Sequence, residues 1–305
     1  MKKLILLSLK TLRMNSPCHF ICSIKLKYKK NNYFYTLLLI LFATTAHQAI
    51  AADDKTYIVG IVPQFETHRL HSIWRPILTE LEQRTGLKFK LRGSPTIPGF
   101  EQEFLNGQFD FAYMNPYHVL LANKEKGYIP LVRDHGKKLY GVLVVTTDSP
   151  YKSVRDLDNK TIAFPAPNAL GASLLIRADM QDVHKIHITP KYVKTHDSVY
   201  LNTAMKRTNA GGGVQKTFNN QPDKIRNRLR VIYKTREVAP HPFVAHPRIN
   251  NDITDRVKNA LIAMGQEEKS RQLLGEIPIK QIGPSSMADY QPLSLMGLER
   301  FYIKP

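Results

Sequence analysis

Hydrophobic positions in this chain form short apolar runs that alternate with longer amphipathic segments. The runs are rich in β-branched and aromatic residues, which is typical of strands, and we expect strands at residues 57–62, 87–91, 109–113, 129–132, 140–146, 162–164, 188–193 and 229–234. Apolar residues at helical spacing lie between them, and we expect helices at residues 70–84, 98–106, 116–122, 174–180, 199–206 and 253–264. Strands that alternate with helices predict an α/β fold, in which mostly parallel sheets are flanked by helices.

One junction between a strand and a helix organises the rest of the chain. The apolar run at residues 109–113 stops at Asn115 and Pro116, and Asn is a good N-cap while Pro suits the first helical position. A helix that begins at the end of a buried strand presents free backbone N–H groups and the positive end of its dipole to one point. Further side-chain donors at this point are Tyr113, Tyr117 and His118. The junction therefore predicts an anion site, and the alternative is an ordinary turn.

The same arrangement recurs three times further along the chain. The later junctions lie at residues 165–173, 195–198 and 210–214, and the four together can face one cleft. The last junction contains Gly211, Gly212 and Gly213. A run of glycines either lets the backbone approach a ligand closely or forms a simple turn, and the sequence leaves both interpretations open.

Two breaks in the pattern indicate two lobes. Asp148-Ser149-Pro150 ends the first series of strands and helices, and a proline-rich extended segment occupies residues 239–247. We therefore expect a first lobe at residues 52–147 plus 239–305 and a second lobe at residues 148–238. A chain that crosses twice between lobes is typical of a hinged clamp around a cleft.

Composition and charge narrow the possible ligands. The chain of 305 residues has a formal net charge of +19, and residues 1–51 hold eight basic residues and no acidic one, which leaves +11 for the rest. A positive balance favours anionic ligands. Nucleic acid is the alternative, but the charges are scattered and no nucleic-acid motif is present. Both cysteines, Cys18 and Cys22, lie before residue 52, so the remaining chain has no disulfide or cysteine metal site.

The first 51 residues have the pattern of a secretory signal. A basic segment at residues 25–30 precedes an apolar run at residues 33–43 and the small-residue motif Ala49-Ile50-Ala51, which predicts cleavage after Ala51. The apolar run is short for a transmembrane span, and an uncleaved anchor is the alternative. Residues 1–24 form an unusual extension, and an upstream start codon is one explanation for it.

Several segments, in this order along the chain, resemble the phosphonate-binding family of periplasmic substrate-binding proteins, the receptors of ABC importers for phosphonate, phosphite and phosphate. The matching segments are Gly60-Ile61-Val62-Pro63-Gln64, Trp74-Arg75-Pro76, residues 81–86, residues 107–113, Asp156-Leu157, residues 195–199 and the tail from Pro284 with Asp289-Tyr290. The resemblance implies a two-lobed clamp of the type II binding-protein class, located in the periplasm, that holds a small oxyanion between its lobes. It also implies a monomer that works with a permease, without a cofactor or catalysis.

The resemblance also implies which residues hold the ligand. In the first lobe they are Gln64, Tyr113, Asn115 and Tyr117, and in the second they are Asn168, Ala169, Ser173, His196, Asp197 and Ser198. N–H and O–H donors suit the outer oxygens of a tetrahedral oxyanion. Relatives that bind aminoalkyl phosphonates hold the amine with acidic residues, where this chain has Gly211–Gly213, so phosphite, phosphate or methylphosphonate fits better.

Two other functions and one metal site remain open alternatives. The protein can serve a membrane sensor instead of an importer, and the same fold class includes thiamine-precursor synthases. Against an enzyme, Asp197 beside His196 is a sequence neighbour and not a demonstrated catalytic pair. His196, His241 and His246 make a zinc site possible by number, but the five-residue spacing of the last two is not that of a helical ligand pair, and we expect no metal.

Overall fold

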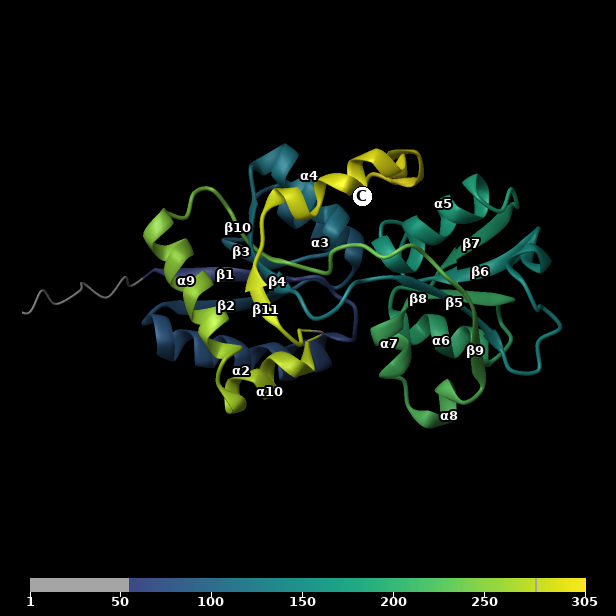
Figure 1. Ribbon diagram of the computed structural model, residues 1–305, viewed down its shortest axis with the longest axis horizontal. Helices are drawn as coiled ribbons and strands as arrows, with labels where there is room; N and C mark the ends of the chain where they lie inside the picture. Colours follow the sequence, from purple (N-terminus) through teal and green to yellow (C-terminus); the bar gives the residue numbers. More distant parts are fainter. Residues whose placement is uncertain (1–54, 278) are drawn as a thin grey trace, which may run out of the picture. The chain divides into compact units, whose positions relative to one another are not determined.

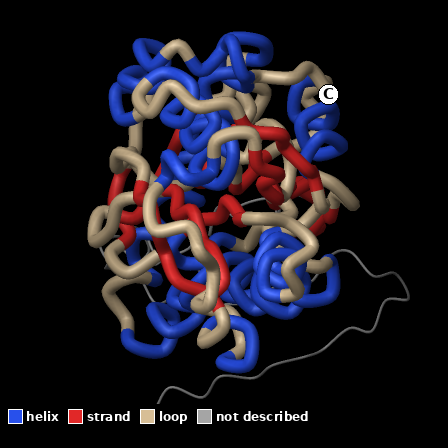
Figure 2. Tube along the Cα trace, turned by 90° about the vertical axis from the view of Figure 1, so that its right-hand side faces the viewer, coloured by secondary structure: helices blue, strands red, loops and turns tan. Residues whose placement is uncertain are grey.

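The structure is a computed structural model that describes residues 55–277 and 279–305. The predictions for the leader, its cleavage after Ala51 and its cysteines lie outside the described residues. Within the described ranges, no helix combines the length and the apolar character that a membrane crossing requires. Two sheets form the framework, and helices cover both of them (Figures 1 and 2).

The first lobe is built on a six-stranded sheet with the strand order β11-β4-β10-β3-β1-β2. In chain order its strands are β1 (Thr56–Ile61), β2 (Lys88–Gly93), β3 (Phe111–Tyr113), β4 (Ile129–Asp134), β10 (Phe243–Ala245) and β11 (Ile282–Pro284). One helical layer consists of α2 (Thr67–Thr85), α9 (Asn251–Met264) and α10 (Glu268–Glu276), which pack on one another. The opposite layer consists of α3 (Ile97–Leu105) and α4 (Pro116–Lys126).

The second lobe is built on a five-stranded sheet with the order β7-β6-β8-β5-β9. Its strands are β5 (Gly141–Thr146), β6 (Lys160–Phe164), β7 (Ile188–Tyr192), β8 (Ala210–Val214) and β9 (Leu229–Lys234). The short helix η1 (Val154–Leu157) precedes β6, and a π-helical turn, η2 (Leu170–Leu174), continues directly into α5 (Leu175–Asp182). On the other face lie α6 (His196–Ala204), α7 (Gln215–Asn219) and α8 (Asp223–Arg226).

The pairing of the strands corrects two expectations. Both sheets are mixed rather than mostly parallel, since β10 runs antiparallel to β3 and β4, and β5 runs antiparallel to β8 and β9. The strand expected at residues 140–146 belongs to the second lobe, whereas the sequence placed it in the first. The chain therefore first crosses between Asp134 and Gly141, and a bridge between Leu139 and Val238 ties this connection to the returning one.

The glycine triplet is neither a turn nor a loop but the middle of the buried strand β8. A Cβ at Gly213 would lie 2.0 Å from Tyr200 Oη of α6, and one at Gly212 would lie 2.4 Å from the carbonyl oxygen of Ala172 in η2. Because successive residues of a strand face opposite sides, the missing side chains let one helix approach each face. The glycines thus bring the starts of η2 and α6 close to the sheet.

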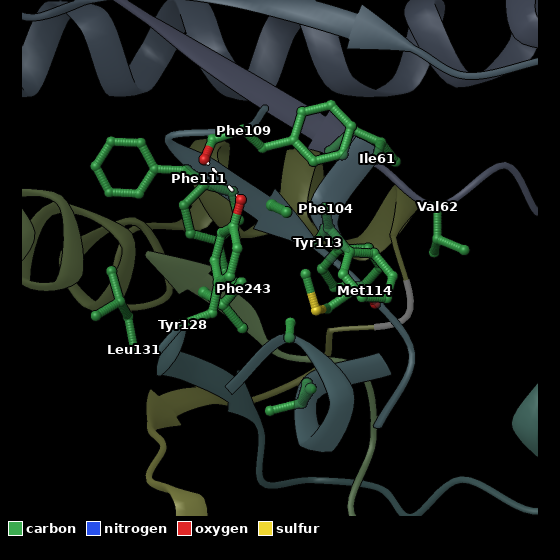
Figure 3. Close-up of a cluster of buried hydrophobic side chains, with 14 of the residues drawn as sticks. Ile61, Val62, Phe104, Phe109, Phe111, Tyr113, Met114, Tyr128, Leu131 and Phe243 are labelled. Carbon is green, nitrogen blue, oxygen red and sulfur yellow. Dashed lines mark hydrogen bonds between the residues drawn. The ribbon is translucent and has the colours of Figure 1, made fainter. Parts of the chain in front are cut away.

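An aromatic core fixes the carboxyl end of β3 (Figure 3). Phe109 and Phe111 are fully buried, and Phe111 stacks on Phe243 of β10 with ring centroids 5.8 Å apart. The buried Tyr128 donates its hydroxyl hydrogen to the carbonyl of Phe109 over 2.8 Å. Each buried ring of this kind stabilises the fold by about 1.5–3 kcal/mol, so the strand that leads into α4 is held rigidly.

The C-terminal segment contacts both lobes, although the sequence placed it on the first lobe alone. It comprises three short helices, η3 (Met287–Asp289), η4 (Gln291–Met296) and η5 (Leu298–Phe301). η4 packs on α4 of the first lobe, and η5 packs on α5 of the second. Arg177 of α5 donates to the carbonyl of Phe301 over 2.7 Å, which ties the segment to the second lobe.

Candidate functional site

A small cavity lies where the two lobes meet. Its lining consists of Val62, Gln64, Ile97, Asn115, Ala169, Leu170, Gly171, Ala172, His196, Val214 and His241. Residues from all four predicted junctions are present, so these junctions do meet at one cavity. In the described part of the chain no carboxylate contributes to the lining, which makes the cavity better suited to an anion than to a cation.

Asn115 caps α4 as the sequence predicts, but in doing so it closes that helix to an anion. Its Oδ1 accepts from the backbone N–H groups of Tyr117 and His118, both over 2.9 Å. The amide of Val119 donates to the carbonyl of Asn115, and Pro116 has no N–H group. All donors of the first turn are therefore used within the helix. What Asn115 offers the cavity is its Nδ2 group, which also donates to the carbonyl of Asn168 across the lobes over 3.3 Å.

The start of η2 offers the open backbone donors that α4 does not. Ala169 is its N-cap, and no side chain caps the helix there. The amides of Ser173 and Leu174 donate to the carbonyl of Ala169 over 2.7 and 3.1 Å. The preceding amides, at residues 170–172, belong to the first turn, where N–H groups have no partner within the helix. Since η2 runs directly into α5, the dipole of the whole helix adds to their attraction for an anion.

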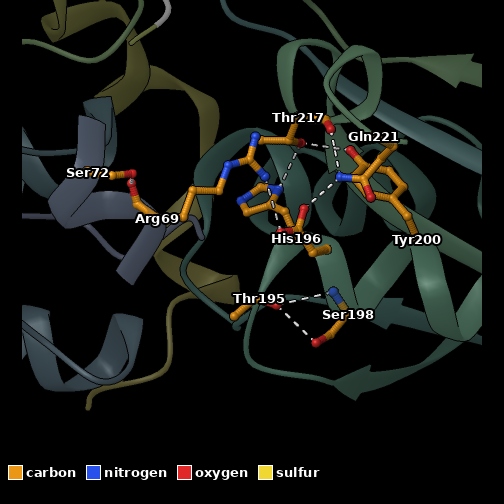
Figure 4. A network of polar contacts seen from close by, with 9 residues as sticks. Arg69, Ser72, Thr195, His196, Ser198, Tyr200, Thr217 and Gln221 are labelled. Carbon is orange, nitrogen blue, oxygen red and sulfur yellow. Dashed lines mark hydrogen bonds and ion pairs between the residues drawn. The ribbon is translucent and has the colours of Figure 1, made fainter. Parts of the chain in front are cut away.

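His196 is the first residue of α6 and belongs to a polar chain inside the second lobe (Figure 4). Its Nδ1 lies 3.2 Å from Thr217 Oγ1, and that hydroxyl lies 2.8 Å from the hydroxyl of Tyr200. Thr195 caps the helix by accepting from the amide of Ser198 over 3.1 Å. Complete burial lowers the pKa of His196 to about 4. The imidazole is therefore neutral at pH 7 and offers the cavity a dipole instead of a formal charge.

His241 is the second imidazole in the lining, and the sequence considered it only as a possible zinc ligand. Its ring stacks on Tyr113 with centroids 5.4 Å apart, and its Nε2 lies 3.1 Å from Gln64 Nε2. Burial, with a smaller effect of His118 and His196 nearby, lowers the pKa of His241 to about 3. Its Nδ1 is buried without a hydrogen-bond partner in the described chain. A buried polar atom of this kind has free capacity for a ligand.

The sequence around His241 indicates its position in the cavity only when the pairing of the strands is known. Pro240-His241-Pro242 leads into β10, which pairs with β3 in the middle of the first sheet. The histidine therefore lies beside the carboxyl end of β3, where the expected junction begins. The sequence alone predicts only a return crossing between the lobes for this segment.

Both predicted tyrosines support the cavity from behind and do not line it. Tyr113 lies in the core against Trp74, with ring centroids 5.0 Å apart, and burial raises its pKa. Tyr117 packs on Tyr302 of the C-terminal segment. The alternation of apolar and polar residues after β3 does not show which side chains turn inward, so these two assignments as direct ligand donors are not supported by the geometry.

Asn168 and Ser173 serve the contact between the lobes and the C-terminal segment. The Nδ2 group of Asn168 donates to Glu101 Oε2 over 2.9 Å and to the carbonyl of Ile303 over 2.6 Å, and its Oδ1 accepts from the amide of Ile303. Ser173 Oγ accepts from Arg177 Nε over 3.1 Å. Neither side chain lines the cavity, because each is already engaged in holding the loop before η2.

Asp197 and Ser198 lie on the outer side of the α6 cap. Asp197 forms an ion pair with Arg69 of α2 over 3.4 Å, which joins the lobes, and it accepts from Gln221 over 2.7 Å. Ser198 takes part in the Thr195 cap. Of the residues predicted to bind the ligand, the structure thus brings Gln64, Asn115, Ala169 and His196 together in one cavity.

The histidines considered for zinc do not come together. His246 packs edge-on against Tyr128, with ring centroids 4.8 Å apart, while His196 and His241 line the cavity. Among residues 55–277 and 279–305 there is no group of three or more His, Cys, Asp or Glu side chains that a metal ion would require.

Comparisons with known proteins agree with the fold. The family described as "ABC transporter, phosphonate, periplasmic substrate-binding protein" matches residues 59–290. The phosphonates-binding periplasmic protein of Escherichia coli (strain K12) is 21% identical over 261 residues, which cover 81% of this chain and 77% of that protein. The phosphate-import protein PhnD of Mycolicibacterium smegmatis is 20% identical over 231 residues, covering 67% and 70%.

Solved structures show the same architecture. PhnD1 from Prochlorococcus marinus in complex with methylphosphonate superimposes with a TM-score of 0.73 and 16% identity, covering 82% of this chain and 99% of that one. A binding-protein component of an ABC phosphonate transporter from Pseudomonas aeruginosa gives 0.72 and 17%, covering 82% and 88%. The fold is that of a type II periplasmic binding protein, a mixed α/β clamp with two sheets. Because the family match spans most of the chain, this protein belongs to the family of periplasmic substrate-binding proteins of phosphonate ABC transporters.

Proposed function

We propose that this protein captures a phosphorus oxyanion, a phosphonate, phosphite or phosphate, between its two lobes and delivers it to the permease of an ABC importer. The observation that supports this most directly is the composition of the cavity. It combines the open amides at residues 170–172 with the side chains of Gln64, Asn115, His196 and His241. These groups are neutral and surround a small volume; the amides donate, and each imidazole donates when its hydrogen is on the nitrogen that faces the cavity.

Neutral donors suit reversible capture of a small dianion. Several hydrogen bonds to an ionised oxygen contribute about 1.5–3 kcal/mol each, and in a buried site they are not weakened by water. No side chain of the cavity carries a formal positive charge. The site without ligand therefore does not have the energetic cost of a buried, unpaired ion. The binding and release that transport requires are therefore compatible with this lining.

The ligand's donors come from both lobes of one chain. Gln64, Asn115 and His241 belong to the first lobe, and His196 belongs to the second with the amides at residues 170–172. An oxyanion between them favours the closed arrangement, because it gains contacts with both lobes only when they meet. Since one chain supplies this lining, we infer that the protein binds its ligand as a monomer. The transport role of its family supports a receptor without catalysis.

Titration calorimetry on the protein recovered after expression of the full chain tests this proposal. Methylphosphonate, phosphite and phosphate are the probes, and sulfate is the control anion. His241→Ala removes a donor from the cavity and should weaken binding at least about tenfold, as expected for the loss of a hydrogen bond to a charged group. His246→Ala is the matched control on the same segment, because His246 lies outside the cavity, and its affinity should stay within about threefold of wild type. Failure of all three phosphorus oxyanions to bind would contradict the proposal.

The location of the protein needs a separate test. We infer that residues 1–51 direct export and are removed after Ala51, since they combine a basic segment, an apolar run and a small-residue motif. Intact-mass measurement of the protein from a periplasmic fraction should give a chain that begins at Ala52. A mass that includes residues 1–51 would indicate a membrane-anchored receptor instead.

A further inference from the structure

A larger groove adjoins the cavity. Gln64, Val214 and His241 line both spaces, so a ligand held in the cavity needs to pass only these side chains to reach the groove. The groove follows the connections between the lobes, and its other walls come from residues 137–140, residues 215–220 and the segment near Pro240. Its free volume of about 360 Å³ is of the size that binds organic ligands in proteins, whereas the cavity is far smaller.

The groove contains lysines that form no ion pair with any other described residue. Lys137, Lys138 and Lys216 line it, and none of the three has an ion pair within 4 Å with a carboxylate in the described part of the chain. Partial burial and the cations Lys280 and Lys216 nearby lower the pKa of Lys137. Like charges that face a common space without counter-ions attract an anion into that space.

Two carboxylates also line the groove, and they offset the lysines only in part. Glu237 and Glu276 are the acidic residues of its wall, and both are exposed without an ion pair to a described cation within 4 Å. The carboxylate that acts on Lys137 is instead Asp134, whose effect is smaller than that of the two lysines. Three lysines against two carboxylates therefore leave the wall of the groove with a net charge of +1.

The groove also has an apolar portion that suits an organic chain. Phe65, Leu139, Tyr140 and Pro240 contribute to its wall. An inorganic oxyanion would leave this surface and the lysines unused. A substituent with a carbon chain and a terminal anion would contact both, because the chain can cover apolar side chains while its end meets the ammonium groups.

We propose that this groove is a second subsite, which binds an anionic group on the organic substituent of the ligand, so that the preferred ligands are phosphonates or phosphate esters with a second negative charge. The inference rests on the proposed function, since it assumes that the phosphoryl head occupies the cavity. The head is held by neutral donors between the lobes, and the substituent passes Gln64 and His241 into the groove. The ammonium groups of Lys137, Lys138 and Lys216 then supply the charge that the cavity itself lacks.

Matched probes separate the two subsites. Propylphosphonate and 3-phosphonopropionate have substituents of similar length, and only the second ends in a carboxylate. At low ionic strength 3-phosphonopropionate should bind at least about tenfold more tightly than propylphosphonate, and added salt should reduce this ratio because the lysines are near the surface. The double variant Lys137→Gln/Lys216→Gln should lose most of the ratio, because its affinity for 3-phosphonopropionate should fall by a much larger factor than its affinity for propylphosphonate. Lys191→Gln, an exposed lysine on β7, is the matched control and should retain the full ratio.

The outcomes distinguish this inference from the function on which it rests. Equal affinities for propylphosphonate and 3-phosphonopropionate would overturn the second subsite and leave the phosphonate receptor intact. Tighter binding of 2-aminoethylphosphonate than of 3-phosphonopropionate would also overturn it, because the carboxylates of Glu237 and Glu276 would then bind the charged end of the substituent. If no phosphonate binds at all, the proposed function fails and the subsite fails with it.

Discussion

Replacing Gly213 by alanine places a methyl group where α6 leaves no room for it. The new Cβ would lie 2.0 Å from the hydroxyl oxygen of Tyr200, a distance that no packed pair of atoms tolerates. Tyr200 is fully buried, and its hydroxyl donates to the carbonyl of Val214 over 3.2 Å and lies 2.8 Å from Thr217 Oγ1. Thr217 in turn contacts His196 in the cavity. The substitution therefore displaces a ring that holds a proposed ligand donor.

The expected cost follows from two effects. Overpacking of a tight interior position costs about 1–3 kcal/mol, and displacement of the tyrosine hydroxyl removes hydrogen bonds worth about 1 kcal/mol. The free energy of unfolding of Gly213→Ala should thus be lower than that of wild type by about 2–4 kcal/mol. For a chain of this size the melting temperature should fall by roughly 5–15 °C. Affinity for the oxyanion should weaken about tenfold, because His196 loses its fixed position.

Urea unfolding and titration calorimetry on the same preparations measure both effects. Gly275→Ala in α10 is the matched control, since a Cβ there has no heavy atom within 4 Å and alanine favours a helix by about 1 kcal/mol; it should be neutral or stabilising. Tyr200→Phe in the Gly213→Ala background removes the closest atom and should restore part of the loss beyond additivity. A Gly213→Ala protein within about 0.5 kcal/mol of wild type would refute the claim that β8 needs glycine for the approach of α6.

Three further predictions address charge and the contacts between the lobes. The free energy of unfolding should fall as the pH drops from 6.5 toward 4, by up to about 1.4 kcal/mol per pH unit for each of His196 and His241. The folded imidazoles have lowered pKa values of about 4 and about 3, so only the unfolded chain takes up protons in this range. Urea unfolding at pH 5 and 7.5 checks this, and His241→Gln should make the dependence less steep. Arg177→Met should destabilise the protein by about 2–4 kcal/mol and speed hydrogen exchange in residues 298–303. The substitution leaves a carbonyl of the second lobe and one of the C-terminal segment without their hydrogen-bond donor. Unchanged exchange would contradict this link. Arg69→Ala should change stability by less than about 1 kcal/mol, because its ion pair with Asp197 is partly exposed, and a larger loss in urea unfolding would show that this pair matters more than its exposure suggests.

The elements that depend on local pattern were predicted well. Asn115 caps α4 through its side chain, and Gly86 ends α2 in the left-handed conformation, because capping is decided by a residue and its immediate neighbours. The partner of each strand was not predictable in the same way. Whether β5 pairs in the first or the second sheet depends on residues far along the chain, and its own apolar run is compatible with either. The glycines of β8 lack the apolar side chains that indicate a strand, so their role appeared only with the helices that pack on them.

The candidate site was likewise predicted only in part from the sequence. The sequence located the four junctions, and their convergence follows from the topology of an α/β clamp. It could not decide which side chain at each junction faces the cavity. At β3 the cap residue Asn115 faces it while Tyr113 turns into the core, and before η2 the backbone faces it while Asn168 holds the C-terminal segment. These choices depend on the contacts between lobes, which leave no periodic signal in the sequence.

A cavity made almost entirely of donors also bears on which oxyanion it prefers. Hydrogen phosphate carries a hydroxyl that needs an acceptor when it is buried, whereas the dianions of phosphite and methylphosphonate do not. Asn115 Oδ1 already accepts two amides of α4, and no carboxylate lines the described cavity. Among the side chains of the lining, the acceptors that remain are the Gln64 carbonyl oxygen and one nitrogen of each neutral imidazole, His196 and His241. Since His241 has one nitrogen beside Gln64 and the other without a partner, the tautomer of this ring decides whether a protonated oxyanion is accommodated or loses a hydrogen bond. We therefore expect discrimination between phosphate and phosphonate to depend on His241 more than on any other residue of the cavity.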